Sequence, residues 1–263
     1  GKERNYIWES RKKRFNAGAP GSRDYNKLIA DEKKITQYYF SHTRSQLVML
    51  LLFGIVFFLW IFSNFRSMKR LDKLGALEKL SFRYIKPLPI FASLIFILNL
   101  APLFDLNAPE IYIESIIVLL MITLTVYFRK RLPKDLFFWW LVFIAIFVLI
   151  LFSRLFGLPY SLQRWWLLIL NGASFALAIL LVIKFKKKYH DRKIALLSVR
   201  LYILLNMLAF LCNLFGRVTL ANVFSSTAIY ALVQMAGLLI FIQVIKEAFL
   251  LQIQSSRLRK NYP

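Results

Sequence analysis

The sequence predicts an all-α membrane protein with about seven transmembrane helices, an outside amino terminus and a cytoplasmic carboxyl terminus. Three observations predict this fold class. The chain of 263 residues is 59% hydrophobic with a mean hydropathy of +0.56, yet it carries a formal charge of +23. Its apolar residues gather in long runs, and its basic residues lie in the short segments between those runs. Soluble domains do not combine these properties, whereas polytopic helical membrane proteins do.

The chain order gives three predicted regions. Residues 1–46 are polar and form an extracytoplasmic segment that leads into the first helix. Seven apolar blocks follow within a transmembrane domain over 47–245, and each approaches the roughly 20 helical residues that cross a hydrocarbon core. Because the backbone in lipid must satisfy its own hydrogen bonds, each block is predicted to be a helix. The blocks are 47–63, 87–104, 111–128, 136–152, 165–183, 201–215 and 223–245, and a basic cytoplasmic tail over 246–263 closes the chain.

The predicted orientation comes from the Lys and Arg residues between the blocks. Their numbers, from the connection after the first block to the tail, are 7, 0, 4, 2, 7, 1 and 4. Basic residues stay in the cytoplasm, so this alternation places the carboxyl terminus inside and the amino terminus outside. Residues 1–46 hold eleven basic and five acidic residues, but long segments are translocated largely regardless of charge.

Paired tryptophans mark the ends of two predicted spans. Trp139 and Trp140 follow the basic stretch RKRLPKD at the inner interface, and Trp165 and Trp166 follow Arg164 at the outer interface. Tryptophan concentrates at the headgroup level, where its ring is half buried and its N–H stays hydrated. These five residues are predicted to anchor their helices at the bilayer boundaries.

Few residues in the predicted spans suit chemistry. The single acidic residue there is Glu114, near the outer end of the third block, where Arg154 or Arg164 can pair with it. A structural ion pair is favoured over an ion-binding site. His190 fits a solvated basic loop better than a catalytic pair, and neither a glycine-rich phosphate loop nor a metal-ligand spacing is present. The sequence therefore predicts no enzyme, no cofactor and no metal.

Polar residues within the last three blocks fall on helical stripes. Amide and hydroxyl side chains on one face are used for helix packing in lipid, and each interhelical bond contributes about 1 kcal/mol. We expect packing here rather than a solute pathway, and the pattern identifies no pore-lining residue. The predicted stripe consists of Asn171, Ser174, Asn206, Asn213, Thr227 and Gln234. The basic charge lies on no soluble module with interleaved aromatics, so membrane lipids are the predicted partner and nucleic acid is not.

Three stretches resemble the amino-terminal membrane region of the large MscS-like mechanosensitive channels, particularly the MscK-type members. They are APLFDLNAPEIYIE (101–114), YFRKRLPKDLFFWW (127–140) and LQRWWLLILNGASFALAIL (162–180). The closing VTLANVFSSTAIYALVQMAGLLIFIQVI (218–245) is similar to the helices that precede the pore in that family, and the resemblance covers roughly residues 85–250.

The resemblance implies a function that composition alone does not. In such channels the outer helices sense membrane tension and lipid occupancy, and a homo-oligomeric ring, usually a heptamer, shares one pore. The implied location is the bacterial inner membrane, with a role in osmotic stress. The family's Gly/Ala-rich pore helix and cytoplasmic β domain are expected beyond Pro263, so no pore residue is assigned.

A second class of function stays open on the sequence. The chain fits a non-channel polytopic membrane protein, either an accessory subunit of a membrane complex or a carrier. A gene that ends near Pro263 would favour the accessory subunit. Solute uptake that depends on Asn171 or Gln234 would favour the carrier.

Overall fold

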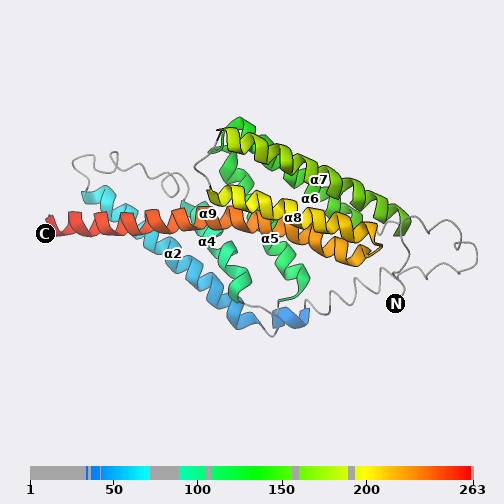
Figure 1. Ribbon diagram of the computed structural model, residues 1–263. Coiled ribbons are helices and arrows are strands. Elements are labelled where there is room, and N and C mark those ends of the chain that lie inside the picture. Colours follow the sequence, from blue (N-terminus) through cyan, green and yellow to red (C-terminus); the bar gives the residue numbers. More distant parts are fainter. Residues whose placement is uncertain are drawn as a thin grey trace, which may run out of the picture. The chain divides into compact units, whose positions relative to one another are not determined.

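A computed structural model describes residues 34, 37–41, 43–71, 89–104, 108–155, 160–188 and 193–261 (Figure 1). Within these ranges the chain is helical apart from short turns, and it forms no strand. Most of the predicted segment 1–46 lies outside them, so its extracytoplasmic placement stays a prediction. The helices are α2 (Arg44–Leu71), α4 (Pro89–Phe104), α5 (Glu110–Arg129), α6 (Lys134–Leu155), α7 (Tyr160–Lys188), α8 (Lys193–Leu214) and α9 (Val218–Asn261).

Each predicted apolar block coincides with a helix, and the all-α fold class is confirmed for the described ranges. Six of these helices are long and apolar enough to cross a membrane, as in a multi-pass membrane protein. The remaining helix, α4, has 16 residues and rises about 24 Å, less than the roughly 30 Å of a hydrocarbon core. Six helices could therefore cross a membrane, and a seventh crossing, by α4, stays a prediction.

The helix ends follow from local chemistry rather than from hydropathy. Pro109 and Pro133 stand before α5 and α6, where a missing N–H costs nothing, and their carbonyls accept the first helical hydrogen bonds. The last helix, α9, runs well beyond the predicted block 223–245. Hydropathy marks only the apolar part of a helix, whereas Lys, Arg, Gln and Leu continue the helix outside that part.

The chain divides into two compact units, which are described separately. Unit 1 comprises the ranges Gly1–Lys33 and Arg131–Met235, and its described helices are α6, α7, α8 and the first part of α9. Unit 2 comprises Lys34–Lys130 and Ala236–Pro263, and it contains α2, α4, α5 and the remainder of α9.

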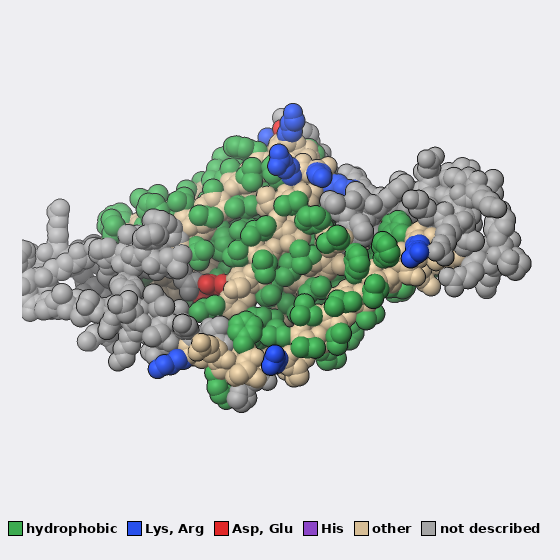
Figure 2. Space-filling view, turned by 180° about the vertical axis from the view of Figure 1, so that it is seen from behind, with side chains coloured by type: hydrophobic (Ala, Val, Ile, Leu, Met, Phe, Trp, Pro, Cys, Tyr) green, Lys and Arg blue, Asp and Glu red, His purple; other side chains and the backbone are tan. Residues whose placement is uncertain are grey.

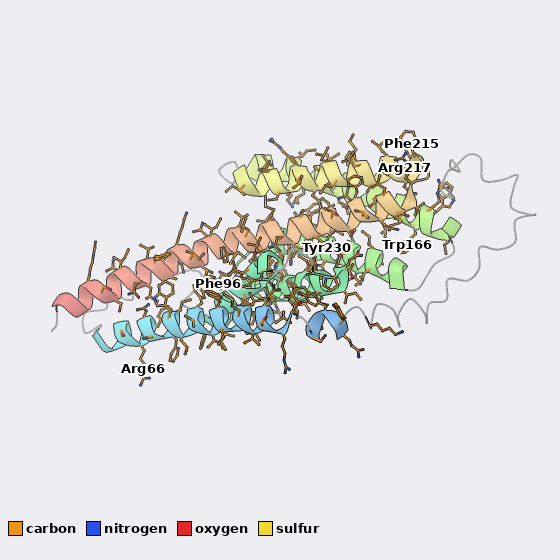
Figure 3. All side chains as sticks on the ribbon, turned by 90° about the horizontal axis from the view of Figure 1, so that it is seen from below. Arg66, Phe96, Trp166, Phe215, Arg217 and Tyr230 are labelled. Carbon is orange, nitrogen blue, oxygen red and sulfur yellow. The ribbon has the colours of Figure 1, made fainter. Side chains whose placement is uncertain are left out.

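Aromatic stacking joins three helices of unit 2. The rings of Phe57 on α2 and Phe96 on α4 lie nearly parallel, with centroids 3.9 Å apart. Phe96 (labelled in Figure 3) also stacks with Phe241 of α9, with ring centroids 5.4 Å apart. Such pairs contribute about 0.5–1.5 kcal/mol beyond the burial of their area. Next to this stack, Gly54 of α2 faces Ile97 so closely that a Cβ at position 54 would overlap the isoleucine side chain.

A side-chain hydrogen bond joins α2 to α9 further along α9 in unit 2. Trp60 Nε1 on α2 donates to Gln252 Oε1 at 3.1 Å, and the indole also meets Phe249 edge-on with centroids 5.8 Å apart. The bond is partly buried, and it joins segments 192 residues apart in sequence.

Trp60→Phe should lower the free energy of unfolding in detergent micelles by about 0.5–1 kcal/mol, because it removes this bond and keeps most of the ring. In a double-mutant cycle with Gln252→Met, the second substitution should cost almost nothing once the indole is gone. Fully additive losses would show that the bond does not stabilise the protein.

Aromatic side chains also pack the interior of unit 1. Phe143 of α6 meets Tyr202 of α8 edge-on at 5.0 Å, and Phe147 of α6 meets Tyr230 of α9 at 6.1 Å. Trp166 Nε1 of α7 donates to the backbone oxygen of Leu149 at 3.3 Å. These contacts connect α6 with each of the other three helices of the unit.

The outward surfaces of the helices are apolar. Hydrophobic side chains cover much of the face seen in Figure 2, and Lys and Arg side chains appear there in a few separate places. In α2, exposed apolar residues occur along most of the helix; they include Val48, Leu52, Val56, Leu59 and Phe62. In a soluble protein this surface would promote aggregation, whereas in a bilayer it faces acyl chains.

Candidate functional site

The candidate site is the polar interior of unit 1, which lies between α7, α8 and α9. Buried residues recur every three or four positions on each helix, as in the seam of a coiled coil. We call these residues the unit 1 seam. On α7 they are Arg164, Leu167, Asn171, Ser174, Ala178 and Leu181; on α8 they are Val199, Tyr202, Asn206, Ala209 and Asn213; on α9 they are Val218, Ala221, Ser225 and Ala228.

At one end of the seam, Arg164 and Asn213 hold α7 against α8 by reciprocal hydrogen bonds. The Asn213 Nδ2 donates to the backbone oxygen of Arg164 at 2.8 Å, and an Arg164 guanidinium nitrogen donates to the backbone oxygen of Asn213 at 3.4 Å. Both residues are buried, with 6% of Arg164 and none of Asn213 exposed. Each side chain thereby donates a hydrogen bond to the backbone oxygen of the other residue, although the two residues are distant in sequence.

The Arg164 guanidinium also lies at the carboxyl end of α8. There the chain turns through Gly216, whose φ of 78° is open to glycine without strain. Gly216 N bonds to Asn213 O at 3.1 Å and Arg217 N bonds to Cys212 O at 2.9 Å, which is the Schellman pattern of a helix end. A cation beside the last carbonyls of a helix is electrostatically favourable. Figure 3 shows Phe215 and Arg217 at this turn, with Trp166 towards the same end of unit 1.

In the middle of the seam, Asn171 links α7 to α9. Ser225 Oγ donates to Asn171 Oδ1 at 2.7 Å, and neither side chain is exposed. The Nδ2 of Asn171 has no hydrogen-bond partner among the described residues. A carboxamide whose second polar atom stays unpaired makes a single specific contact rather than a closed network.

One turn further along α7, Ser174 and Tyr202 join α7 to α8 through their hydroxyl groups. Asn206 lies one turn after Tyr202, and its Nδ2 donates to the Tyr202 backbone oxygen at 2.8 Å. Asn206 therefore bonds within its own helix, and Tyr202 makes the contact between helices.

The structure brings together four of the six residues of the predicted stripe. Asn171, Ser174, Asn206 and Asn213 are buried in the unit 1 seam, whereas Thr227 is exposed and Gln234 is partly exposed. Ser225 and Tyr202 belong to the seam and were missed by sequence reasoning. The spacing Ala221–Ser225–Ala228 and the separation of four positions between Tyr202 and Asn206 are the signals that point to them.

The five predicted anchor residues have different environments. Trp165 is 57% exposed, Trp139 and Trp166 are partly exposed, and Trp140 is 8% exposed. Arg164, in contrast, points into the seam with only 6% of its surface exposed. Successive residues on a helix differ by 100° in direction, so Arg164 can face the interior while its neighbour Trp165 faces outward.

The predicted ion pair of Glu114 with Arg154 or Arg164 stays a prediction. Glu114 belongs to unit 2 and Arg164 to unit 1, and the side chain of Arg154 lies outside the described residues. Within the described ranges, Arg164 is the one charged side chain that is buried, and three or more His, Cys, Asp or Glu side chains nowhere gather as a metal site would need.

Unit 2 has a second close contact, at Gly237 of α9. A Cβ at this position would lie 2.8 Å from Asn99 Oδ1 on α4 and 3.1 Å from Leu120 Cδ2 on α5. Asn99 is 3% exposed, and its Nδ2 donates to the Ile95 backbone oxygen at 2.7 Å, so the amide has little freedom to move. Gly237 thus allows three helices to meet at one point.

The seam and the Gly237 contact share a chemical character. Both combine apolar side chains with small residues, amides or hydroxyls, and small and amide-bearing residues join helices in lipid by close approach and by weak hydrogen bonds. Such an arrangement suits the packing and repacking of helices. The chain matches no protein-family model, no curated protein sequence and no solved structure.

Proposed function

We propose that the chain is the tension- and lipid-sensing transmembrane region of an MscS-type mechanosensitive ion channel, and that it surrounds a pore formed elsewhere in the full protein. The observation that carries the proposal is the contrast between the two faces of the helices. Large apolar side chains face outward along α2 and α8, whereas the polar contacts between the helices are mostly neutral and individually weak. The resemblance of residues 85–250 to the MscK-type channels supports the same function.

Membrane tension favours whichever conformation occupies the larger area in the bilayer plane. A helix interior held by hydrogen bonds of about 1 kcal/mol each can exchange one packing for another at modest cost. Lipids that contact the outward faces shift this balance only if they bind one conformation better than the other. Apolar outward faces and weak polar contacts between the helices support this proposal.

The proposed topology has seven crossings, with α4 among them, an outside amino terminus and a cytoplasmic carboxyl terminus. The alternation of basic residues between the spans supports this orientation. The proposed setting is a homo-oligomeric ring in the bacterial inner membrane, assembled through regions outside this chain. That setting rests on the resemblance.

Pressure-clamp recording of the full-length protein in giant proteoliposomes tests the function. Suction should evoke a current that is absent from protein-free liposomes, and Asn171→Leu should change the threshold pressure. Thr227→Val, which removes an exposed hydroxyl, should leave the threshold unchanged.

A full-length protein that gives no pressure-activated current would contradict the channel proposal. Uptake of a labelled solute that requires Asn171, without any such current, would support a carrier instead. Stable co-purification with another membrane protein, again without current, would support an accessory subunit.

A further inference from the structure

The outward face of α8 carries one arginine among apolar side chains. Arg200 is exposed, as are its apolar neighbours on this helix, which are Ile194, Leu197, Leu201, Leu204 and Met207. At 100° per residue, Arg200 lies within about 60° of Leu197, Leu204 and Met207. It points away from Tyr202 and the unit 1 seam. The exposed residues Leu197, Arg200, Leu204 and Met207 form what we call the α8 outer stripe.

Arg200 belongs to the apolar part of α8. The stretch of this helix that is apolar enough to cross a membrane is Leu196–Leu214. It begins before the predicted block 201–215, which left Arg200 in the connection, so Arg200 lies four residues, or about 6 Å, inside its boundary. A charge that faces lipid is costly, and charged residues in spans normally face the protein interior or a cavity. The described residues give Arg200 neither a hydrogen bond nor an ion pair. No described residue therefore neutralises its charge.

The direction of the side chain indicates where that group lies. Helical side chains lean toward the amino-terminal end of their helix, and in α8 the amino-terminal end is the nearer boundary of the apolar stretch. A long basic side chain can cover apolar surface with its stem while its head reaches the interface. The guanidinium of Arg200 is thereby carried to the level of the lipid phosphates. Guanidinium binds phosphate through two parallel hydrogen bonds.

The surrounding charge selects among phospholipids. The contacts of Arg164 with Asn213 and of Ser174 with Tyr202 show that α7 and α8 run antiparallel, so the end of α7 and the start of α8 lie at the same end of unit 1. Exposed Lys184 lies at this end of unit 1. A positive surface at the headgroup level favours anionic over zwitterionic lipids.

We propose that Arg200 binds the phosphate of an anionic phospholipid whose acyl chains lie against the α8 outer stripe. The arginine supplies the hydrogen bonds, Lys184 adds a second positive charge that favours negative headgroups, and Leu197, Leu204 and Met207 supply the apolar contact. This inference rests on the lipid-sensing part of the proposed function, but lipid binding itself requires no channel activity.

Native mass spectrometry of the purified full-length protein, titrated with phosphatidylglycerol or phosphatidylcholine in detergent, tests the site. Arg200→Gln should weaken the tightest phosphatidylglycerol binding by about tenfold or more. A hydrogen bond to a charged group contributes at least about a factor of ten in affinity. Arg200→Lys should retain part of the affinity. Arg217→Gln is the matched control, because Arg217 is also exposed but lies beyond the opposite end of α8.

The site would be refuted if Arg200→Gln bound phosphatidylglycerol as tightly as the parent protein, or if Arg217→Gln lost as much affinity. Equal affinity for phosphatidylcholine would refute the preference for anionic lipid. Displacement of the lipid by soluble glycerol phosphate would show that the acyl contact contributes nothing, and would refute the stripe. Arg200 makes no hydrogen bond or ion pair with the described residues, so equal thermal unfolding of the two glutamine variants is expected and separates lost binding from lost folding.

The two proposals can fail independently. Lipid binding that depends on Arg200 in a protein without pressure-activated current would leave the lipid site standing and reject the channel. A pressure-activated current in a protein whose lipid binding does not depend on Arg200 would support the channel and reject the lipid site.

Discussion

Gly237→Ala is expected to lower the free energy of unfolding by about 1–3 kcal/mol, although alanine is the better helix former. The added methyl group would lie 2.8 Å from Asn99 Oδ1, 3.0 Å from Asn99 Nδ2 and 3.1 Å from Leu120 Cδ2. Asn99 cannot retreat cheaply, because it is buried and bonded to the Ile95 backbone oxygen. Unfolding of the purified protein in mixed micelles, followed by circular dichroism, measures the loss, and Gly237→Leu should enlarge it.

Gly172→Ala is the matched control for this substitution. Gly172 also lies within a helix, but a Cβ there would lie 3.7 Å from Phe210, an ordinary van der Waals distance. The control should be neutral or stabilising by up to about 1 kcal/mol, which is the propensity gain from glycine to alanine. Combining Gly237→Ala with Asn99→Ala should recover part of the lost stability, because the overlapping atoms are removed. Equal behaviour of the two glycine variants would show that the close approach at Gly237 is unimportant.

The helices could be predicted because their cause is local. In lipid every backbone donor and acceptor must be satisfied within the helix, so apolar runs such as 111–128 and 165–183 leave no alternative to α5 and α7. The ends were less predictable. Block 223–245 corresponds to α9, which continues to Asn261, because the polar residues after the apolar run are good helix formers and nothing stops the helix.

The stripe could be predicted in part, and its errors have a clear physical cause. Projection on one helix finds residues that share a face, and four predicted residues do lie in the unit 1 seam. Projection cannot tell which face a neighbouring helix covers, and Thr227, grouped with Gln234 on α9, proved to be exposed. The covered face of α9 is set by its neighbours and runs through Ala221, Ser225 and Ala228.

Arg164 illustrates the same limit. Arg164 precedes Trp165 and Trp166 in the sequence, which is typical of an interface anchor. It is also seven residues, or about two helical turns, before Asn171, so it lies on the same face of the helix as the seam. Only the position of α8 decides between these faces, because the backbone oxygen of Asn213 accepts from the guanidinium. A pattern within one helix cannot contain that information.

Asn171→Leu is expected to lower the free energy of unfolding by about 1–2 kcal/mol and, in the proposed channel, to change the pressure threshold. Leucine removes the acceptor of the 2.7 Å bond from Ser225 and leaves that hydroxyl without this partner where no part of it is exposed. The hydrophobic gain from leucine is small in lipid, where the surroundings of an unpacked helix are as apolar as the seam. Loss of the bond should therefore dominate.

A double-mutant cycle separates this bond from a general effect of polarity. Ser225→Ala alone should cost at least as much as Asn171→Leu, because it leaves the buried Asn171 Oδ1 without this partner, and the two together should cost less than the sum. Thr227→Val removes a hydroxyl from the exposed face of the same helix and should change neither stability nor threshold. Additive losses would mean that Asn171 and Ser225 act separately, and the seam would then not be what couples α9 to α7. Coupled losses with a shifted threshold would instead identify this single bond as part of the balance between the closed and open packings.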